Sequence, residues 1–252
     1  MKNNSNITDN EFWDNKYYRG NPTYVLLDPY YGRNGLFHRK FGCFIEYNSN
    51  VLELGCGASK YLMFFKLIMG LKTYGIDFSA QGIEKLNIMA NKKGIEHNVV
   101  LGDFFEVDMD ERKFDLIFHA GLMEHFKNPL LLVERCRFFC KDNGLMIFLI
   151  PNFISKAWSY HSKICPLNAA AHIRYSKENI EKALDNKFEL VETGFWGYPQ
   201  IYAGGVPEAA AAIILQKLNL LIAFLISAAR PKYSGCSNSI WASTVYFVCK
   251  PK

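Results

Sequence analysis

The sequence predicts an α/β protein with an open, mostly parallel sheet of seven strands and helices on both faces. Short apolar runs and segments of helical periodicity alternate from residue 50 to residue 195. Such alternation is typical of parallel strands joined by right-handed crossovers. A glycine turn, Gly55-Cys56-Gly57, follows the first apolar run, and an acidic residue stands at or just after the end of each of the first three runs.

The expected elements follow from apolar spacing and from turn and cap residues. Strands are expected at 50–54, 73–77, 98–101, 115–119, 144–150, 188–195 and 243–250. Helices are expected at 36–47, 60–70, 79–93, 129–141 and 176–185, with Ser79 and Ser176 as N-caps. A helical arm over residues 1–20, capped by Thr8 or Asp9, comes before a loop rich in glycine and proline.

A single domain accounts for the whole chain. A length of 252 residues with 50% hydrophobic content suits one large core that needs no disulfide or metal to stabilise it. We divide residues 1–252 into an N-terminal arm or lid (1–47), a ligand-binding core (48–195), a hydrophobic insertion (196–240) and a last strand (241–252).

Charge and cysteine content exclude several classes of protein. The net charge of +5 forms no clustered basic stripe, which disfavours a nucleic-acid partner. The seven cysteines form no CxxC pair and the N-terminus has no apolar signal segment, so we expect reduced thiols in the cytoplasm. Cys136 and Cys140 lie one helical turn apart without further ligands nearby, and we therefore expect no metal site.

The insertion contains a long apolar helix, expected at 207–229. Its apolar run, 209–229, is close to the length of a membrane span, but Gln216, Lys217 and Asn219 interrupt its middle. A helix that is apolar nearly all round must be covered. A second copy of the chain in a homodimer, the interior of the same domain, and a lipid or membrane surface remain open as alternatives.

Residues with binding chemistry gather after the first three strands. Gly55 and Gly57 let the main chain turn tightly and approach a ligand without a Cβ. In open parallel sheets, ligands bind at the carboxyl ends of the strands. At that edge Asp77 could accept hydrogen bonds from ribose hydroxyls and Asp103 from an adenine amino group, with Glu53 as a third acid.

These motifs resemble those of the class I S-adenosylmethionine (SAM) methyltransferases, which have a Rossmann-like fold. The likeness is closest to the small-molecule group, which has an Asp/Glu-x-Gly-x-Gly loop and a Leu-Glu-His type signature after the fourth strand. It covers residues 48–150 and, more loosely, 176–195. The matching segments are 53–57, 75–79, 102–104, 114–126 and 143–147.

The resemblance implies SAM as the cofactor and S-adenosylhomocysteine as its product. Glu53 would face the amino group of SAM, Ser59 its carboxylate, and Asp77 the ribose hydroxyls. Phe78 would lie against the adenine, and Asp103 and Phe104 would hold the adenine edge. The cofactor-binding residues implied are Glu53, Gly55, Cys56, Gly57, Ser59, Asp77, Phe78, Asp103, Phe104, His119 and Ala120, the last two through their main chain.

Methyl transfer is an in-line displacement, in which the protein mainly aligns the reactants and excludes water. A general base is needed only if the acceptor is a hydroxyl or a protonated amine. His125 and Glu124, directly after the fourth strand, are the candidate catalytic residues, and support of the loop is the alternative role for His125. The candidate acceptor contacts are Tyr17, Tyr31, His161 and His172.

The sequence therefore predicts a SAM-dependent methyltransferase of a small or medium organic acceptor, held in an apolar or aromatic pocket. O-, N- and C-methylation remain open. A methyltransferase-like binding or scaffold subunit and an RNA or protein methyltransferase are the alternatives. A nicotinamide dehydrogenase is disfavoured, because Lys60 stands where its third glycine would be.

Overall fold

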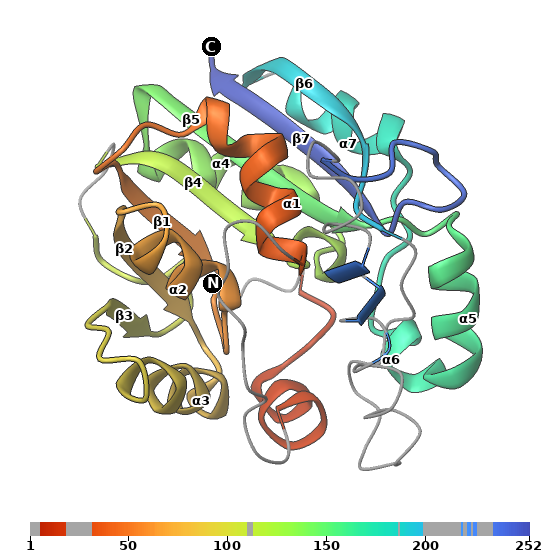
Figure 1. Cartoon of the computed structure of the whole chain (residues 1–252), viewed down its shortest axis with the longest axis horizontal. Coiled ribbons are helices and arrows are strands. Elements are labelled where there is room, and N and C mark those ends of the chain that lie inside the picture. The colour runs from red at the N-terminus through yellow and green to blue at the C-terminus, as the bar shows by residue number, and fades with distance from the viewer. Residues whose placement is uncertain are drawn as a thin grey trace.

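The computed structural model describes residues 6–18, 32–109, 113–185, 187–198, 218, 221–222, 224–225 and 234–252. Its centre is a seven-stranded sheet with the order β3-β2-β1-β4-β5-β7-β6 (Figure 1). β7 runs antiparallel to β5 and β6, and the other neighbouring strands are parallel. The expected fold class is confirmed. The strands are β1 Asn50–Leu54, β2 Lys72–Asp77, β3 Asn98–Leu101, β4 Phe114–Ala120, β5 Cys140–Pro151, β6 Phe188–Trp196 and β7 Thr244–Pro251.

Several helices begin where the sequence offers a capping side chain. Ser59, Ser79 and Ser176 each accept a hydrogen bond from a main-chain N–H in the first turn of the following helix. The N-caps predicted at Ser79 and Ser176 are therefore confirmed. The helices are η1 Phe12–Tyr17, α1 Gly32–Phe41, η2 Gly42–Phe44, α2 Lys60–Leu67, α3 Ala80–Asn91, η3 Met123–His125, α4 Pro129–Phe139, α5 Lys156–Ile164, α6 Pro166–Ala170 and α7 Lys177–Leu184.

Each face of the sheet is covered by its own apolar core. On one face α4 and α7 pack with strand residues that include Ile117 and Phe148. On the other face α1 and α2 pack with residues that include Phe118 and Ile147. Neighbouring strand residues point to opposite faces, which is why Ile117 and Phe118 belong to different cores. Packing on both faces holds the carboxyl ends of the central strands in place.

Some elements differ from the sequence-based expectation. The helix expected at 36–47 is α1, which begins and ends earlier than expected; Leu36, Phe37 and Phe41 are buried in the core, and this packing outweighs the low helix propensity of the glycines in its first turn. Segment 152–175 contains α5 and α6, although no helix was expected there. β5 begins at Cys140, so α4 ends two residues earlier than expected.

The long apolar helix expected at 207–229 falls almost entirely outside the described residues. Within it the structure describes Leu218 and the pairs 221–222 and 224–225, all of them helical. What covers this helix stays a prediction. Among the described helices, none combines the length and the apolar character needed to cross a membrane.

Candidate active site

The turn after β1 brings the main chain to the carboxyl edge of the sheet. Gly55 and Gly57 have φ angles of +67° and +37°, in a region that side chains rarely adopt. The N–H groups of Gly55 and Cys56 donate to the Ile76 carbonyl at 2.9 and 3.2 Å and tie the turn to β2. The Cys56 side chain points into the core, since a Cβ on Gly75 would approach its sulfur to 2.7 Å. Cys56 can therefore contact a ligand only through its main chain.

Glu53, in β1, is an acid buried beneath this turn. The Ser59 hydroxyl donates to Oε2 of Glu53 at 2.6 Å and accepts from the Leu62 N–H at 3.0 Å. The resemblance assigned this hydroxyl to the carboxylate of the cofactor, but in the structure it donates one hydrogen bond and accepts another within the protein. Glu53 is 4% exposed, and desolvation raises the pKa of its carboxyl to about 8. At pH 7 this carboxyl is therefore neutral unless a cation lies beside it.

Asp77, at the end of β2, joins the glycine turn to the start of α3. Its Oδ2 accepts from the Gly57 N–H at 2.7 Å, and its Oδ1 accepts from the Ser79 N–H at 2.7 Å. Burial raises the pKa of this carboxyl to about 6. A carboxylate offers about four acceptor positions. Two of them remain for hydroxyl groups of a ligand in front of the turn.

A cavity of about 430 Å³ lies between the N-terminal arm and the ends of β2 and β3. Phe78 and Asp103, two residues assigned to the adenine, are in its wall. Its volume falls within the roughly 300–1,000 Å³ of small-molecule sites. The lining residues are Asn6, Thr8, Asn10, Asp14, Phe78, Ala80, Leu101, Gly102 and Asp103.

The loop after β3 is held in place by α4. Arg135 donates to the Phe104 carbonyl at 2.6 Å and to the Val107 carbonyl at 2.8 Å. Asp103 accepts from the Phe105 N–H through Oδ1 at 2.9 Å, which leaves its second oxygen for a ligand. The ring of Phe104 departs from expectation: it is 2% exposed and packs in the core rather than in the cavity wall. Burial of this apolar ring away from water explains the difference.

The N-terminal arm is fixed to the start of α3. Asp9 accepts from the Phe12 N–H at 2.8 Å beside the start of η1, whereas the N-cap position of η1 itself is Glu11, whose side chain makes no capping hydrogen bond. Asp14 accepts from the Ser79 hydroxyl and, at 3.2 Å, from the Gln81 N–H. A carboxylate is stabilised at such a helix N-terminus by the free N–H groups and the helix dipole.

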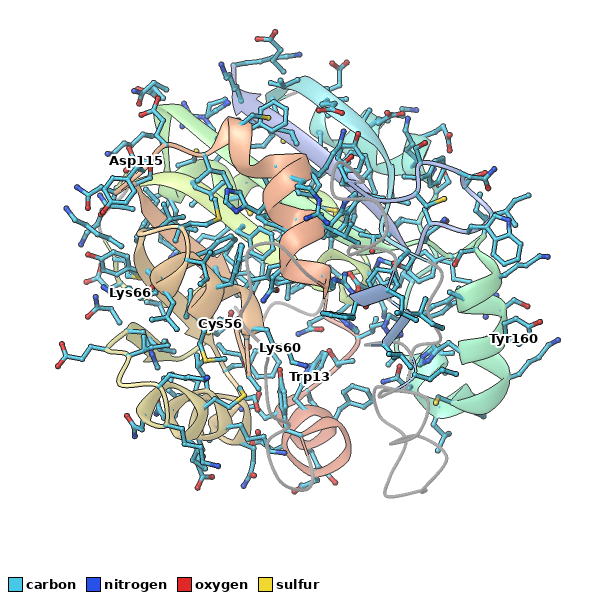
Figure 2. The ribbon with its side chains drawn as sticks, in the orientation of Figure 1. Trp13, Cys56, Lys60, Lys66, Asp115 and Tyr160 are labelled. Atoms are coloured by element: carbon cyan, nitrogen blue, oxygen red, sulfur yellow. The ribbon has the colours of Figure 1, made fainter. Side chains whose placement is uncertain are left out.

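The other side of the arm contacts η3. The Ile7 N–H donates to the His125 carbonyl at 2.8 Å, and the Trp13 ring meets the His125 imidazole edge-on with centroids 5.0 Å apart. Figure 2 shows Trp13 on the side of η1 that faces the sheet. The arm thus bridges the carboxyl edge from α3 to η3.

The phenol of Tyr18 lies directly on the glycine turn. A Cβ on Gly57 would come within 1.8 Å of the Tyr18 hydroxyl oxygen, and a Cβ on Gly82 within 2.8 Å of its ring. The two glycines therefore make room for this ring. A ligand that passes over Gly57 meets Tyr18.

β4 ends with His119 and Ala120, for which main-chain contacts were expected. The His119 side chain is fully buried and stacks on Phe148 with ring centroids 4.4 Å apart. Within the described part of the chain neither of its ring nitrogens has a hydrogen-bond partner, and burial lowers the pKa of this imidazole to about 3. The side chain of His119 is part of the core, so only its main chain could reach a ligand.

Directly after β4, η3 carries both candidate catalytic residues. The His125 Nδ1 lies 2.7 Å from the Ala171 carbonyl, and the His172 Nδ1 lies 2.8 Å from the Asn168 carbonyl. Because a carbonyl only accepts, each Nδ1 carries the proton. The rings of His125 and His172 are 4.8 Å apart. The structure thus brings a candidate acceptor contact beside the candidate base.

Glu124 and these two imidazoles are uncharged at neutral pH. Burial raises the pKa of Glu124 to about 8 and lowers those of His125 and His172 to about 3 and about 4. His161, a candidate acceptor contact in α5, is 3% exposed. Its Nε2 lies 2.9 Å from Oδ1 of Asn168 in α6, so this side chain is engaged between the two helices.

The remaining predicted site residues and the unexpected ones lie in the arm. Tyr31 and the side chain of Tyr17 are outside the described residues, so their roles stay predictions. The sequence predicts a helical arm over residues 1–20, but a local pattern cannot say which helix an acid of the arm will contact. Five residues of the arm line or touch the site without having been predicted as site residues, although Thr8 was a candidate cap: Asn6, Thr8, Asn10, Asp14 and Tyr18.

The arrangement fits a ligand with a flat ring, vicinal hydroxyls and a cationic group. The cavity wall supplies Phe78 for the ring and Asp103 as an acceptor at its edge. Asp77 retains acceptor positions next to the turn. Glu53 is a buried carboxyl that a positive charge would ionise. These are the groups of SAM, which the sequence resemblance implied.

Comparison with known proteins identifies the family. The family model described as "Methyltransferase domain" matches residues 45–194. A ubiquinone biosynthesis O-methyltransferase of Histophilus somni is 28% identical over 114 residues, 43% of this chain and 48% of that protein. A malonyl-[acyl-carrier protein] O-methyltransferase of Ilyobacter polytropus is 24% identical over 161 residues, 60% of each. The chain thus spans between about half and three-fifths of the length of these curated relatives.

The same fold is present in solved structures. A SAM-dependent methyltransferase from Archaeoglobus fulgidus superposes with a TM-score of 0.55 at 18% identity, over 86% of this chain and 94% of that one. At this identity the likeness shows the fold alone. The family model, however, spans more than half of the chain. This protein therefore belongs to the methyltransferase domain family, and its family and fold imply S-adenosylmethionine as the cofactor.

Proposed function

We propose that the protein transfers a methyl group from SAM to a hydroxyl group of a small organic acceptor. The observation that carries the proposal is the set of acids around the glycine turn, Glu53, Asp77 and Asp103, beside a cavity of about 430 Å³. The curated relatives bear the name O-methyltransferase, which favours oxygen over nitrogen or carbon as the acceptor atom.

Each acid has a separate role in holding the cofactor. The free acceptor positions of Asp77 would take the ribose hydroxyls. Asp103 would take the adenine amino group, with the ring against Phe78 in the cavity. Glu53 would ionise against the α-ammonium group, directly or through one water, and the resulting charge pair would offset the desolvation that keeps it neutral.

SAM supplies a methyl group already activated on a sulfonium sulfur. The protein therefore has to align the acceptor oxygen, exclude water and take up the hydroxyl proton. The arm serves the second purpose, because Trp13 and Asp14 fix it across the carboxyl edge of the sheet. The third would fall to the η3 side of the site, where the neutral imidazole of His125 could accept the proton, whereas Glu124 is already protonated at pH 7.

Calorimetric titration with SAM tests the proposal, followed by detection of S-adenosylhomocysteine with phenolic and aliphatic hydroxyl acceptors. Asp77→Ala should weaken SAM binding by about 1–3 kcal/mol, since it removes hydrogen-bond acceptors. The matched control is Glu84→Gln, an exposed acid on α3, which should bind SAM as the wild type does. Absence of binding at millimolar SAM would overturn the enzyme proposal in favour of a scaffold subunit.

We further propose that the protein acts in the cytoplasm, with segment 207–229 as its contact to a second copy or to a lipid surface. The apolar sequence of this segment supports the proposal. Sedimentation analysis and flotation with phosphatidylcholine vesicles, each repeated on Leu221→Glu, test it. If the protein sediments as a monomer and does not float with the vesicles, both the contact to a second copy and the contact to lipid are refuted.

A further inference from the structure

We propose that Glu124, His125 and His172 form a binding site for a divalent transition-metal ion. One possible ligand atom from each of the three residues lies within 4.8 Å of the other two. Glu124 and His125 lie in η3, and His172 follows α6 in the chain. The fold therefore brings the third ligand to the first two from a distant segment.

Main-chain hydrogen bonds orient both imidazoles for metal binding. Since Nδ1 of His125 donates to Ala171 and Nδ1 of His172 donates to Asn168, the lone pair of each ring is on Nε2. Neither Nε2 has a hydrogen-bond partner among the described residues. Metal-binding histidines usually donate their second ring N–H to a carbonyl or carboxylate, which fixes the tautomer. Both rings show this arrangement.

The carboxyl group of Glu124 is an independent indication of a ligand. Glu124 is 1% exposed, and its Oε2 is buried without a hydrogen-bond partner among the described residues. Leaving such a group without a partner is costly, and few buried polar groups are left so. Gly121, at a φ of +76°, leaves room on the other side, where a Cβ would lie 3.4 Å from Oε1. A cation would supply the missing partner.

The kind of ligands selects the class of metal. Imidazole suits zinc and its transition-metal neighbours, whereas magnesium and calcium favour oxygen ligands. Two histidines and a glutamate form the ligand set of many catalytic zinc sites, which keep a fourth position open. Zinc bonds of about 2.0–2.1 Å place tetrahedral ligands about 3.4 Å apart. The ligand atoms lie up to 4.8 Å apart, so binding of the ion requires them to approach one another by on the order of 1 Å.

The role of this ion in catalysis rests on the proposed function. An acceptor hydroxyl at the open position would bind the ion through oxygen, and the ion would lower the pKa of that hydroxyl. The proton then leaves to solvent. The oxygen–methyl bond forms as the sulfur–methyl bond breaks, and the electron pair of the broken bond remains on sulfur. In this arrangement His125 is a ligand and the metal ion activates the acceptor.

The test is Zn²⁺ binding by the full chain after dialysis against a chelator, measured in competition with a chromogenic chelator. Cys43 and Cys236, the two thiols that are not buried, are replaced by serine in every sample. We expect one equivalent of Zn²⁺ per chain and no competition by Mg²⁺. Glu124→Gln and His172→Gln should each lower the affinity at least tenfold. The matched control is His97→Gln, another partly buried histidine with one hydrogen bond, and it should bind as the parent does.

Several outcomes would overturn the site. These are the absence of stoichiometric Zn²⁺ binding by the parent, preference for Mg²⁺, or unchanged affinity in either ligand variant. Circular dichroism shows whether each variant folds. If His172→Gln does not fold, the Zn²⁺ affinity of Glu124→Gln is the deciding measurement, because this substitution preserves the shape of the side chain. Retained Co²⁺ absorption bands in both variants would also overturn it.

Parallel titrations with SAM separate this proposal from the proposed function. Zn²⁺ binding without SAM binding would refute the methyltransferase and retain the metal site. SAM binding without Zn²⁺ binding would refute the metal site alone. If the ion activates the acceptor, the stripped protein should bind SAM normally and lose at least tenfold in kcat, and Zn²⁺ should restore it. An unchanged kcat would overturn that role.

Discussion

Glu53 lowers the stability of the folded protein at neutral pH, and one substitution should remove that cost. Burial raises the pKa of its carboxyl from 4.5 to about 8. Below pH 4.5 the carboxyl is neutral in both the folded and the unfolded chain. As the pH rises from 4.5 to 8, only the unfolded chain ionises, so the free energy of unfolding falls. At pH 7, about 2.5 pH units above the ordinary pKa of 4.5, the free energy of unfolding is lower by on the order of 3 kcal/mol, at 1.36 kcal/mol per pH unit.

Glu53→Gln keeps the shape of the side chain and an oxygen that can accept from Ser59, but it cannot ionise. Urea unfolding at pH 5, 6, 7 and 8 should show a variant whose advantage over the wild type grows with pH, with upper limits of about 3 kcal/mol at pH 7 and about 4 kcal/mol at pH 8. Glu46→Gln, an exposed acid, is the control and should change the stability by less than about 0.5 kcal/mol. A difference that is negative at pH 7, or constant across this range, would refute the reasoning.

The same substitution should cost cofactor affinity. With a pKa of about 8, Glu53 is about nine-tenths protonated at pH 7. If the α-ammonium group of SAM ionises it, binding releases about 0.9 proton from this group, and Glu53→Gln abolishes that release. Calorimetry in buffers with different ionisation enthalpies measures the number. Equal proton release by the variant and the wild type would show that Glu53 does not meet the cation.

Three further predictions concern the rest of the site. In a Glu53→Gln background, which removes the proton release of Glu53, the SAM affinity should fall about tenfold per pH unit below about pH 6, because protonation of Asp77 removes its acceptor capacity; a flat dissociation constant from pH 5 to 7 in that background would contradict this. Gly57→Ala should lower the free energy of unfolding in urea by about 1–2 kcal/mol, because Gly57 has a positive φ. The loss should be larger in the wild type than in a Tyr18→Ala background, since the new Cβ would meet the Tyr18 hydroxyl; equal losses would exclude that steric contact. Asp14→Asn should accelerate limited proteolysis in the arm and weaken SAM binding several-fold, since it removes a charge from the α3 N-terminus; unchanged cleavage would contradict that role.

The sequence signals for the proposed cofactor side of the site are local. A glycine pair after an apolar run, with acids at the ends of the next two strands, needs only a parallel sheet to bring Gly57, Asp77 and Asp103 together. The directions of individual side chains required the packed core. The Cys56 and Phe104 side chains point inward because apolar burial is favourable at their positions, and neither fact is encoded in motif spacing.

The contacts in the other half of the site could not be predicted, although His125 and His172 were candidate residues, because these contacts join distant segments. His172 reaches His125 only through the turn after α6, within a segment for which no helix was expected. Asp14 reaches Ser79 across 65 positions of the chain. Such pairs depend on tertiary packing, and hydrophobic periodicity carries no information about them.

This division bears on where acceptor specificity resides. The proposed cofactor contacts all lie between residues 53 and 120, within the family match at 45–194. The proposed acceptor side draws on the arm at 6–18, on η3 and on the turn before α7. The curated relatives align over only 43–60% of this chain, as expected if the core is shared and the covering segments differ. Exchange of the arm between this protein and a relative should therefore alter acceptor choice more than SAM affinity, whereas substitutions at Asp77 should do the reverse.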